Sequence, residues 1–295
     1  MQLAEPATVF VDPRVDPRLD PLSAAGWRAR LDLRLERRAT RTVLAERRHD
    51  GPLAIQKALY PEGDEVCHLI VLHPPAGIAG GDDLAVDIDV GIDARSLATT
   101  PGASKWYRSL GPTARQHLRF SVASGACLEW LPQETIVYDG ARADMATTVR
   151  LDDGAAYLGW EIVCLGRTGA GERFTRGACR MHARVDGPRG PIFIERGAFD
   201  GDDALLGSPA GLCGEPVFGT LLACAANVDD SLVTAARAAL PTAGFGSVTM
   251  LPGVLIARYL GPSTQVAKQY FVALWRILRP AIAGRAAIDP RIWST

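Results

Sequence analysis

The strongest constraint on the fold of this chain is a two-residue alternation of apolar and polar side chains. In residues 84–92, Leu, Val or Ile at every even position alternates with Ala, Asp or Gly at every odd position. Residues 31–36, 118–122 and 179–186 repeat the pattern. A period of two indicates a β-strand with one buried face. Because no helical period separates these runs, we expect an all-β body whose strands pair mostly with their neighbours in sequence.

Helical patterns occur only towards the C-terminus. Asp229 precedes an apolar run over residues 232–240, and Ser263 precedes apolar residues that recur at helical spacing up to Leu278. Asp and Ser are common helix N-caps, and this spacing places apolar side chains on one helix face. We predict two helices, the second ending at Pro280, because proline cannot continue the hydrogen-bond ladder of a helix.

Length and composition favour a single globular domain. The chain has 295 residues, of which 47% are hydrophobic, and this is enough for a sizeable core. Nothing marks a linker after residue 25, so we expect one domain over residues 26–295. Residues 1–25 contain a repeated Val/Leu-Asp-Pro sequence. Its prolines remove backbone donors that strands and helices need, and we predict an extended arm there.

Charge and cysteine usage argue against several protein classes. A net charge of -1 gives no electrostatic basis for binding nucleic acid or an anionic membrane surface. No apolar run reaches the ~18 residues of a membrane-spanning helix. The 6 cysteines lie far apart without a C-x-x-C pair, which favours buried, reduced thiols over a disulfide framework. We therefore expect a cytoplasmic protein that binds neither nucleic acid nor membranes.

Four ordered motifs carry the most specific information. They are residues 72–82 (LHPPAGIAGGD), 99–109 (TTPGASKWYRS), 128–133 (LEWLPQ) and 166–172 (GRTGAGE). In this order, the motifs resemble those of the UreD (also called UreH) family of urease accessory proteins, over roughly residues 25–290. The resemblance implies an irregular β-helix-like body with a few helices at its C-terminal end. It also implies a scaffold and not an enzyme.

The same resemblance implies partners and a cargo. Members of the family act as a scaffold through which nickel reaches apo-urease, in a complex with UreF and the GTPase UreG. We therefore expect these three partners, transient Ni²⁺ and no tightly bound cofactor. The GTP chemistry would belong to UreG, because this chain lacks a phosphate loop. Such a loop needs a helix behind its glycines, whereas Gly80 and Gly81 precede the strand pattern of residues 84–92.

Six side chains are candidates for a transient nickel route, because nickel accepts carboxylate, imidazole and thiolate ligands. They are Asp82, Glu129, Glu161, Glu172, His73 and Cys67. Glu129 and Glu161 interrupt apolar strands, where an unpaired buried carboxylate is costly. Each would either face solvent or line an internal water-filled passage together with Asp82 and Glu172. None of the six has the spacing of a closed metal site, which suits transit better than storage.

Several of these residues also have a structural interpretation. Asp82 could cap a turn, Glu172 could brace its loop, and His73 could be a packed side chain. Strand parity places Cys67 and His73 on one face of their strand and His68 on the other. The sequence leaves both interpretations open.

Residues 99–108 form a candidate interface or its support. The candidates are Thr99, Thr100, Lys105, Trp106, Tyr107 and Arg108. Two cations flank two aromatic side chains, a composition that is enriched at protein interfaces. The two threonines can brace the loop through hydrogen bonds to the backbone. Alternatively, Lys105 pairs with a carboxylate of the body and the motif serves only the internal architecture.

Signatures of the common catalytic sites are absent from the sequence. It has no G-x-S-x-G, H-E-x-x-H or S-x-x-K motif. The main alternative function is a β-rich enzyme that acts on a small polar ligand, with Asp82, Lys105 and Glu172 at its site. A purely structural β-solenoid is a third possibility. An enzyme would turn over alone, whereas a scaffold would be inert without its partners.

Overall fold

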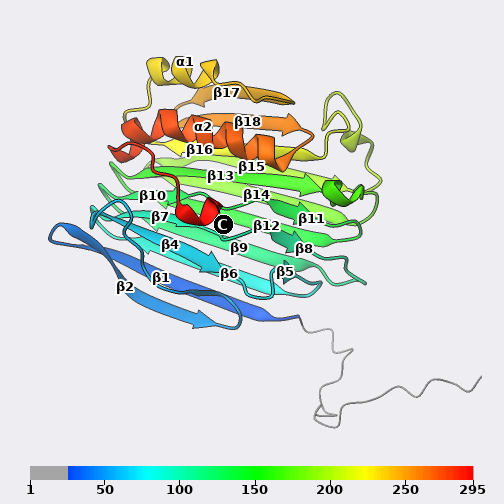
Figure 1. Ribbon diagram of the computed structural model, residues 1–295, viewed down its shortest axis with the longest axis horizontal. Coiled ribbons are helices and arrows are strands. Elements are labelled where there is room, and N and C mark those ends of the chain that lie inside the picture. Colours follow the sequence, from blue (N-terminus) through cyan, green and yellow to red (C-terminus); the bar gives the residue numbers. More distant parts are fainter. Residues whose placement is uncertain (1–25, 295) are drawn as a thin grey trace, which may run out of the picture.

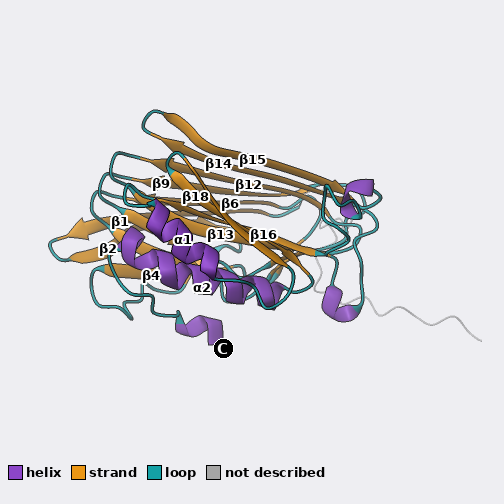
Figure 2. Ribbon diagram, turned by 90° about the horizontal axis from the view of Figure 1, so that it is seen from above, coloured by secondary structure: helices purple, strands orange, loops and turns teal. Residues whose placement is uncertain are grey.

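The computed structural model describes residues 26–294, and the arm predicted for residues 1–25 lies outside this range. Two β-sheets face one another, and the helices cover the outer face of one of them (Figures 1 and 2). The body is a β-solenoid-like structure with its helices near the C-terminus, which confirms the predicted fold class.

The first sheet has seven strands in the order β15-β14-β12-β9-β6-β1-β2. These strands are β1 (Arg28–Arg38), β2 (Arg41–Asp50), β6 (Asp83–Val90), β9 (Ala114–Val122), β12 (Arg142–Leu151), β14 (Ala178–Gly187) and β15 (Gly190–Asp200). The predicted alternation is confirmed in β6, where Leu84, Val86 and Ile88 are buried. Ile92 follows the strand and is exposed, because the chain has already turned away from the core.

The second sheet has eleven strands, and its main order is β17-β18-β16-β13-β10-β7-β4-β3. These strands are β3 (Ala54–Ile55), β4 (Val66–Leu72), β7 (Arg95–Thr99), β10 (Cys127–Trp130), β13 (Ala156–Leu165), β16 (Val217–Cys224), β17 (Phe245–Leu251) and β18 (Val254–Gly261). Three short strands complete the sheet beside this path, namely β5 (Gly77–Ile78), β8 (Ser104–Trp106) and β11 (Thr135–Val137).

The chain coils from one sheet to the other, so that neighbours in space are mostly not neighbours in sequence. In the first sheet β6, β9, β12 and β14 pair in parallel, and in the second β4, β7, β10 and β13 do so. The prediction that sequential strands would pair is therefore wrong for most of the body. Successive strands of the coiled region alternate between the two sheets. Each strand pairs with the corresponding strand of the next coil.

Two apolar cores result from this arrangement. One fills the space between the sheets and contains Leu31, Leu69, Phe120 and Leu128. The other lies between the outer face of the eleven-stranded sheet and the helices. The second sheet is therefore apolar on both faces, whereas the outer face of the first sheet carries charged side chains such as Asp87.

Helix α1 (Asp230–Ala238) begins after the N-cap Asp229, as predicted, and α2 (Thr264–Ala283) begins after the predicted N-cap Ser263. The predicted end of α2 at Pro280 is wrong. The helix continues one turn further to Gly284, which takes a left-handed conformation. Buried contacts of Ile282 in this last turn offset the backbone hydrogen bond that the proline removes. Over the described residues, no helix combines the length and apolarity needed to cross a membrane.

A window into an internal cavity

Three consecutive coils of the eleven-stranded sheet are interrupted at the same level. The chain leaves the sheet at residues 73–76, between β4 and β5, at residues 100–103, between β7 and β8, and at residues 131–134, between β10 and β11. Because β5 pairs with β8 and β8 pairs with β11, the three interruptions lie side by side. Each contains proline, which cannot donate a hydrogen bond to a sheet ladder.

The next coil borders these interruptions on one side, and its strand is continuous. Strand β13 pairs with β10 up to Gly159 and with β11 from Val163 onwards. Residues 160–162 of β13 therefore have no ladder partner on this side. We call the opening between them and the three interruptions the window.

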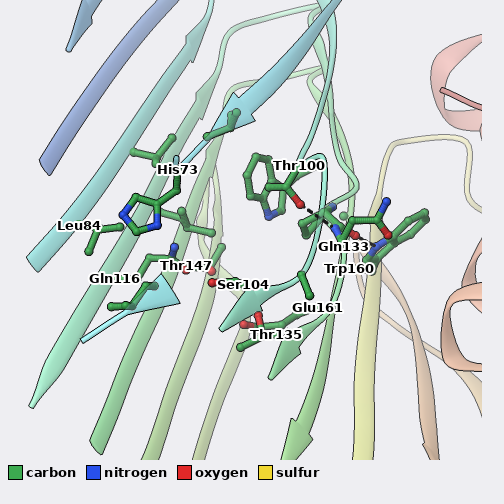
Figure 3. A pocket seen from close by; sticks show the side chains of 18 of the residues that line it. His73, Leu84, Thr100, Ser104, Gln116, Gln133, Thr135, Thr147, Trp160 and Glu161 are labelled. Atoms are coloured by element: carbon green, nitrogen blue, oxygen red, sulfur yellow. Dashed lines mark hydrogen bonds between the residues drawn. The ribbon is translucent and has the colours of Figure 1, made fainter. Parts of the chain in front are cut away.

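The window leads into a cavity of about 210 Å³ between the two sheets (Figure 3). Exposed Pro101 and Gly102 line its outer part, and Leu118 and Trp130 line its inner part. Polar side chains occupy the wall at intervals, including Gln116, Thr147 and Glu161, and Figure 3 shows that they come from both sheets. A cavity lined by both polar and apolar side chains is suited to hold water or a small polar solute.

Glu161 and Glu195 are the acidic side chains of this wall, and Glu161 lies at the level of the window. It lies on β13, and its neighbour across the ladder is Thr220 of β16. Burial, with a smaller contribution from the charge of Glu195, raises the pKa of Glu161 to about 7. Glu195 comes from the opposite sheet and forms an ion pair with Arg258. The Thr220 hydroxyl accepts a hydrogen bond from the same guanidinium at 2.7 Å.

Glu129 does not line this cavity. It lies on β10 beside Leu158 of β13, which faces the helices, whereas Glu161 is three residues further along β13 and faces the opposite side. The carboxylate of Glu129 accepts hydrogen bonds from Arg279 and from the indole of Trp275. The two glutamates therefore cannot share one passage. Neither interpretation offered for Glu129, solvent or passage, describes this paired and buried position.

Asp82 and Glu172 both hold loops in place. The Asp82 carboxylate accepts hydrogen bonds from the backbone N–H groups of Trp27 and Ala79, each at 2.8 Å. Glu172 accepts backbone hydrogen bonds from Asp139 and Arg167 and pairs with the Arg167 side chain at 2.7 Å. Hydrogen bonding to Arg167 lowers the pKa of Glu172. This geometry matches the turn-cap and loop-brace interpretations. Neither residue lines the cavity described above.

The histidine and cysteine candidates separate in the structure. His73 lines the cavity, and burial lowers its imidazole pKa, which favours the neutral, ligating form. Cys67 packs in the core between the sheets, and burial raises its thiol pKa to about 11. His68 lies on the other face of the strand, as predicted, with its Nε2 2.6 Å from Glu62. Within residues 26–294, no group of three or more His, Cys, Asp and Glu side chains is placed to hold a metal.

The two threonines brace the edge of the window. The Thr99 hydroxyl donates to the carbonyl of Leu131 at 2.6 Å, and the Thr100 hydroxyl accepts from the N–H of Gln133 at 2.9 Å. They tie the interruption at residues 100–103 to the one at residues 131–134. Trp106 is a core residue and not a surface residue, because only 1% of it is exposed.

Tyr107 and Arg108 lie at the surface beyond the window. Tyr107 is 39% exposed, and its ring packs edge-on against Tyr138 with centroids 5.3 Å apart. Gly77 lies beneath this ring, where a Cβ atom would come within 2.1 Å of it. A side chain at position 77 would therefore force the Tyr107 ring to move. Leu110, in the same loop, is 95% exposed.

Glu195, Thr220 and Arg258 could not be predicted from the sequence, because their position near Glu161 depends on how the coils stack. A signal for the window was present, however. Proline follows a strand-like segment at positions 74, 101 and 132, at an interval close to one coil. Asp82, Lys105 and Glu172, the residues of the alternative enzyme site, do not line this cavity, and both carboxylates are bonded within their loops.

Comparisons with known proteins agree with this description. A family model described as UreD urease accessory protein matches residues 27–294. A protein of Azoarcus sp. (strain BH72) named "Urease accessory protein UreD" is 54% identical over 270 residues, which cover 92% of this chain and 95% of the relative. Proteins with the same name from Dechloromonas aromatica and Pseudomonas aeruginosa are 54% and 47% identical and cover 93% and 91% of this chain, and 97% and 95% of their own lengths. The chain therefore belongs to the UreD family of urease accessory proteins.

Proposed function

We propose that this protein is a cytoplasmic scaffold through which nickel is delivered to apo-urease, in a complex with UreF and the GTPase UreG. Membership of the UreD family supports an accessory role in urease maturation. The observation that carries the nickel part of the proposal is the position of Glu161. This carboxylate lines an internal cavity, lies close enough to Glu195 for their charges to interact, and has a pKa of about 7.

The chemistry of this wall suits a cation in transit. Ni²⁺ accepts carboxylate oxygen and neutral imidazole nitrogen, which Glu161 and His73 supply. A Ni²⁺ ion near Glu161 would stabilise the ionised carboxylate and displace its proton. Two or three dispersed ligands bind more weakly than a closed four-ligand site, so that the ion can move on.

Substitution of Glu161 tests the nickel proposal. Glu161→Gln keeps the shape of the side chain but removes its charge, and we expect nickel incorporated per urease in cells to fall on the order of tenfold. Glu46→Gln, on the exposed edge strand β2, is the matched control and should leave incorporation unchanged. Wild-type incorporation by a folded Glu161→Gln protein would refute a role of this carboxylate in the route.

The exposed surface around Tyr107 and Arg108 is the proposed docking site for UreF or apo-urease. Truncating a buried interface Tyr or Arg typically costs ~2 kcal/mol, or about thirtyfold in affinity. We therefore expect Tyr107→Ala/Arg108→Ala to weaken capture of one of these partners by about that factor in a pull-down. Ile194→Ala/Arg196→Ala, an exposed pair on β15, is the control. Unchanged capture of both partners by a folded Tyr107/Arg108 variant would restrict this motif to an architectural role.

A further inference from the structure

The C-terminal segment, residues 284–294, lies against the helix-covered face of the eleven-stranded sheet and ends near the window. It leaves α2 at Gly284, where φ is +69°, and runs in front of the sheet to the short 3-10 helix η3 (Arg291–Ser294) (Figure 1). The left-handed conformation of Gly284 reverses the chain direction after α2, and glycine adopts it readily.

Trp293 of η3 contacts two borders of the window. Its indole N–H donates to the Thr99 hydroxyl at 2.9 Å, and Thr99 is the last residue before the interruption at residues 100–103. Its ring lies 5.8 Å from the ring of Trp160, which belongs to the unpaired part of β13 and lines the cavity. The segment is therefore fastened where the cavity reaches the surface.

Lys268 of α2 joins the third border to the same tryptophan. Its ammonium group lies 4.0 Å from the ring of Trp293 and 4.6 Å from that of Trp160. It also donates to the carbonyl of Pro132 at 3.2 Å, within the interruption at residues 131–134. Cation–π contacts and this hydrogen bond place Lys268 between Trp293 and the border of the window.

The start of the segment is held by buried groups, because Arg279 donates to the carbonyl of Ala286 at 2.6 Å and Arg285 lies 3.9 Å from the buried carboxylate of Glu62. Trp293 also packs against buried Trp275, with ring centroids 5.6 Å apart.

The remaining contacts are ion pairs nearer the surface. Asp289 pairs with Arg276 at 2.5 Å, but the two side chains are 45% and 56% exposed. Arg285 pairs with Glu65, which is also 52% exposed. Exposed ion pairs contribute little to stability. Residues 287–292, between the anchor at Ala286 and Trp293, are mostly exposed or half-buried, and such stretches open locally at a lower free energy than the whole domain.

We propose that the last part of the C-terminal segment, residues 287–294, is a displaceable cover over the window, with Trp293 as its latch. When the latch releases Thr99 and Trp160, a small polar solute enters or leaves the cavity at residues 100–103 and 131–134. The inference rests on the proposed function for the identity of the solute, which is Ni²⁺. The opening itself depends only on the contacts of Trp293.

Access to the cavity can be measured without nickel or urease. Ser104 lines the cavity, and Ser104→Cys places a small thiol there with little change of volume. Exposed Cys213 is replaced by Ser in every variant, because the other cysteines are buried. The rate of alkylation of Cys at position 104 by iodoacetamide, followed by mass spectrometry on the full-length protein, then reports how often the cavity is open.

We expect Trp293→Ala to raise this alkylation rate at least tenfold. Trp293→Phe keeps the ring but loses the hydrogen bond to Thr99, and it should raise the rate about fivefold, the loss expected for one neutral hydrogen bond. Phe245→Ala, an exposed aromatic on the remote edge strand β17, is the control and should label at the parent rate.

Parent-rate labelling of a folded Trp293→Ala protein would overturn the proposed cover. If Trp293→Ala fails to fold, the Trp293→Phe rate decides, and no acceleration there would equally overturn it. Since the alkylation assay contains neither nickel nor urease, failure of the Glu161 experiment would leave this result intact, and the reverse also holds.

Discussion

Glu129 of β10 and Glu161 of β13 offer the most instructive comparison in this molecule. Both are single carboxylates in apolar strands of the same sheet, and in the sequence they look alike. The structure places them on opposite faces of that sheet. Glu129 faces α2 and is bonded to Arg279 and Trp275, whereas Glu161 faces the cavity.

The surroundings of Glu129 form a complete buried network. Arg279 is fully buried and donates to Glu129 and to Glu62 at 2.7–3.1 Å. His68 and Trp275 supply further hydrogen bonds. Although burial opposes ionisation, the bonds from His68 and Arg279 lower the pKa of Glu62 to about 2. Charges that are all paired in this way fasten α2 and the C-terminal segment to the sheet.

Glu161 has the opposite electrostatic character. Burial raises its pKa to about 7, so near neutral pH the carboxylate is poised between its two protonation states. A cation that reaches this wall would supply the partner that the protein itself supplies to Glu129. A carboxylate in an apolar strand therefore anchors neighbouring elements where the fold supplies its counter-charge, as at Glu129, whereas burial at Glu161 raises the pKa towards neutrality.

The largest effect is expected from breaking the network at Arg279. Arg279→Leu leaves Glu62 and Glu129 buried without their cation, and removal of one partner from a buried ion pair typically costs about 3–5 kcal/mol. Chemical denaturation at pH 7 should show a loss of this size in the free energy of unfolding. Arg276→Leu, on the exposed side of the same helix, is the control. A loss below about 1 kcal/mol for Arg279→Leu would mean that the network does not hold α2.

A smaller effect, of opposite sign, is expected at Glu161. Its folded-state pKa, about 7, is raised above the ordinary value of 4.5, so the group favours the folded state below pH 4.5 relative to higher pH. That contribution is lost as the pH rises through 7. Glu161→Gln cannot ionise, so the variant should be more stable than the wild type at pH 8 by about 1–2 kcal/mol, less than the full shift because cavity water screens the charge.

This prediction can be read from thermal melts at two pH values. We expect Glu161→Gln to raise Tm by about 2–8 °C at pH 8, from about 2–4 °C per kcal/mol for a domain of this size, and to change it little at pH 5. Equal changes at both pH values would show that Glu161 is ionised at low cost. In that case the contrast with Glu129 would be one of position only.

The sequence by itself determined several of the strands, the helix N-caps and the family. Alternation in residues 84–92 is a local property, because each side chain in a strand points opposite to the one before it, and it predicted β6 within a few residues. Asp229 and Ser263 bond to N–H groups within their own helices, so their role was also visible locally. The four motifs identified the family because their order does not depend on the fold being known.

Only the tertiary structure decided which side chains face the cavity and which face the helices. Parity within a strand fixes neither which coil lies next to it nor which sheet face the helices cover, and therefore Glu129 and Glu161 could not be told apart. The window exists because the prolines at positions 74, 101 and 132 fall at the same level of three coils. Trp293 reaches Thr99 across 194 residues of sequence, a contact that no local pattern encodes.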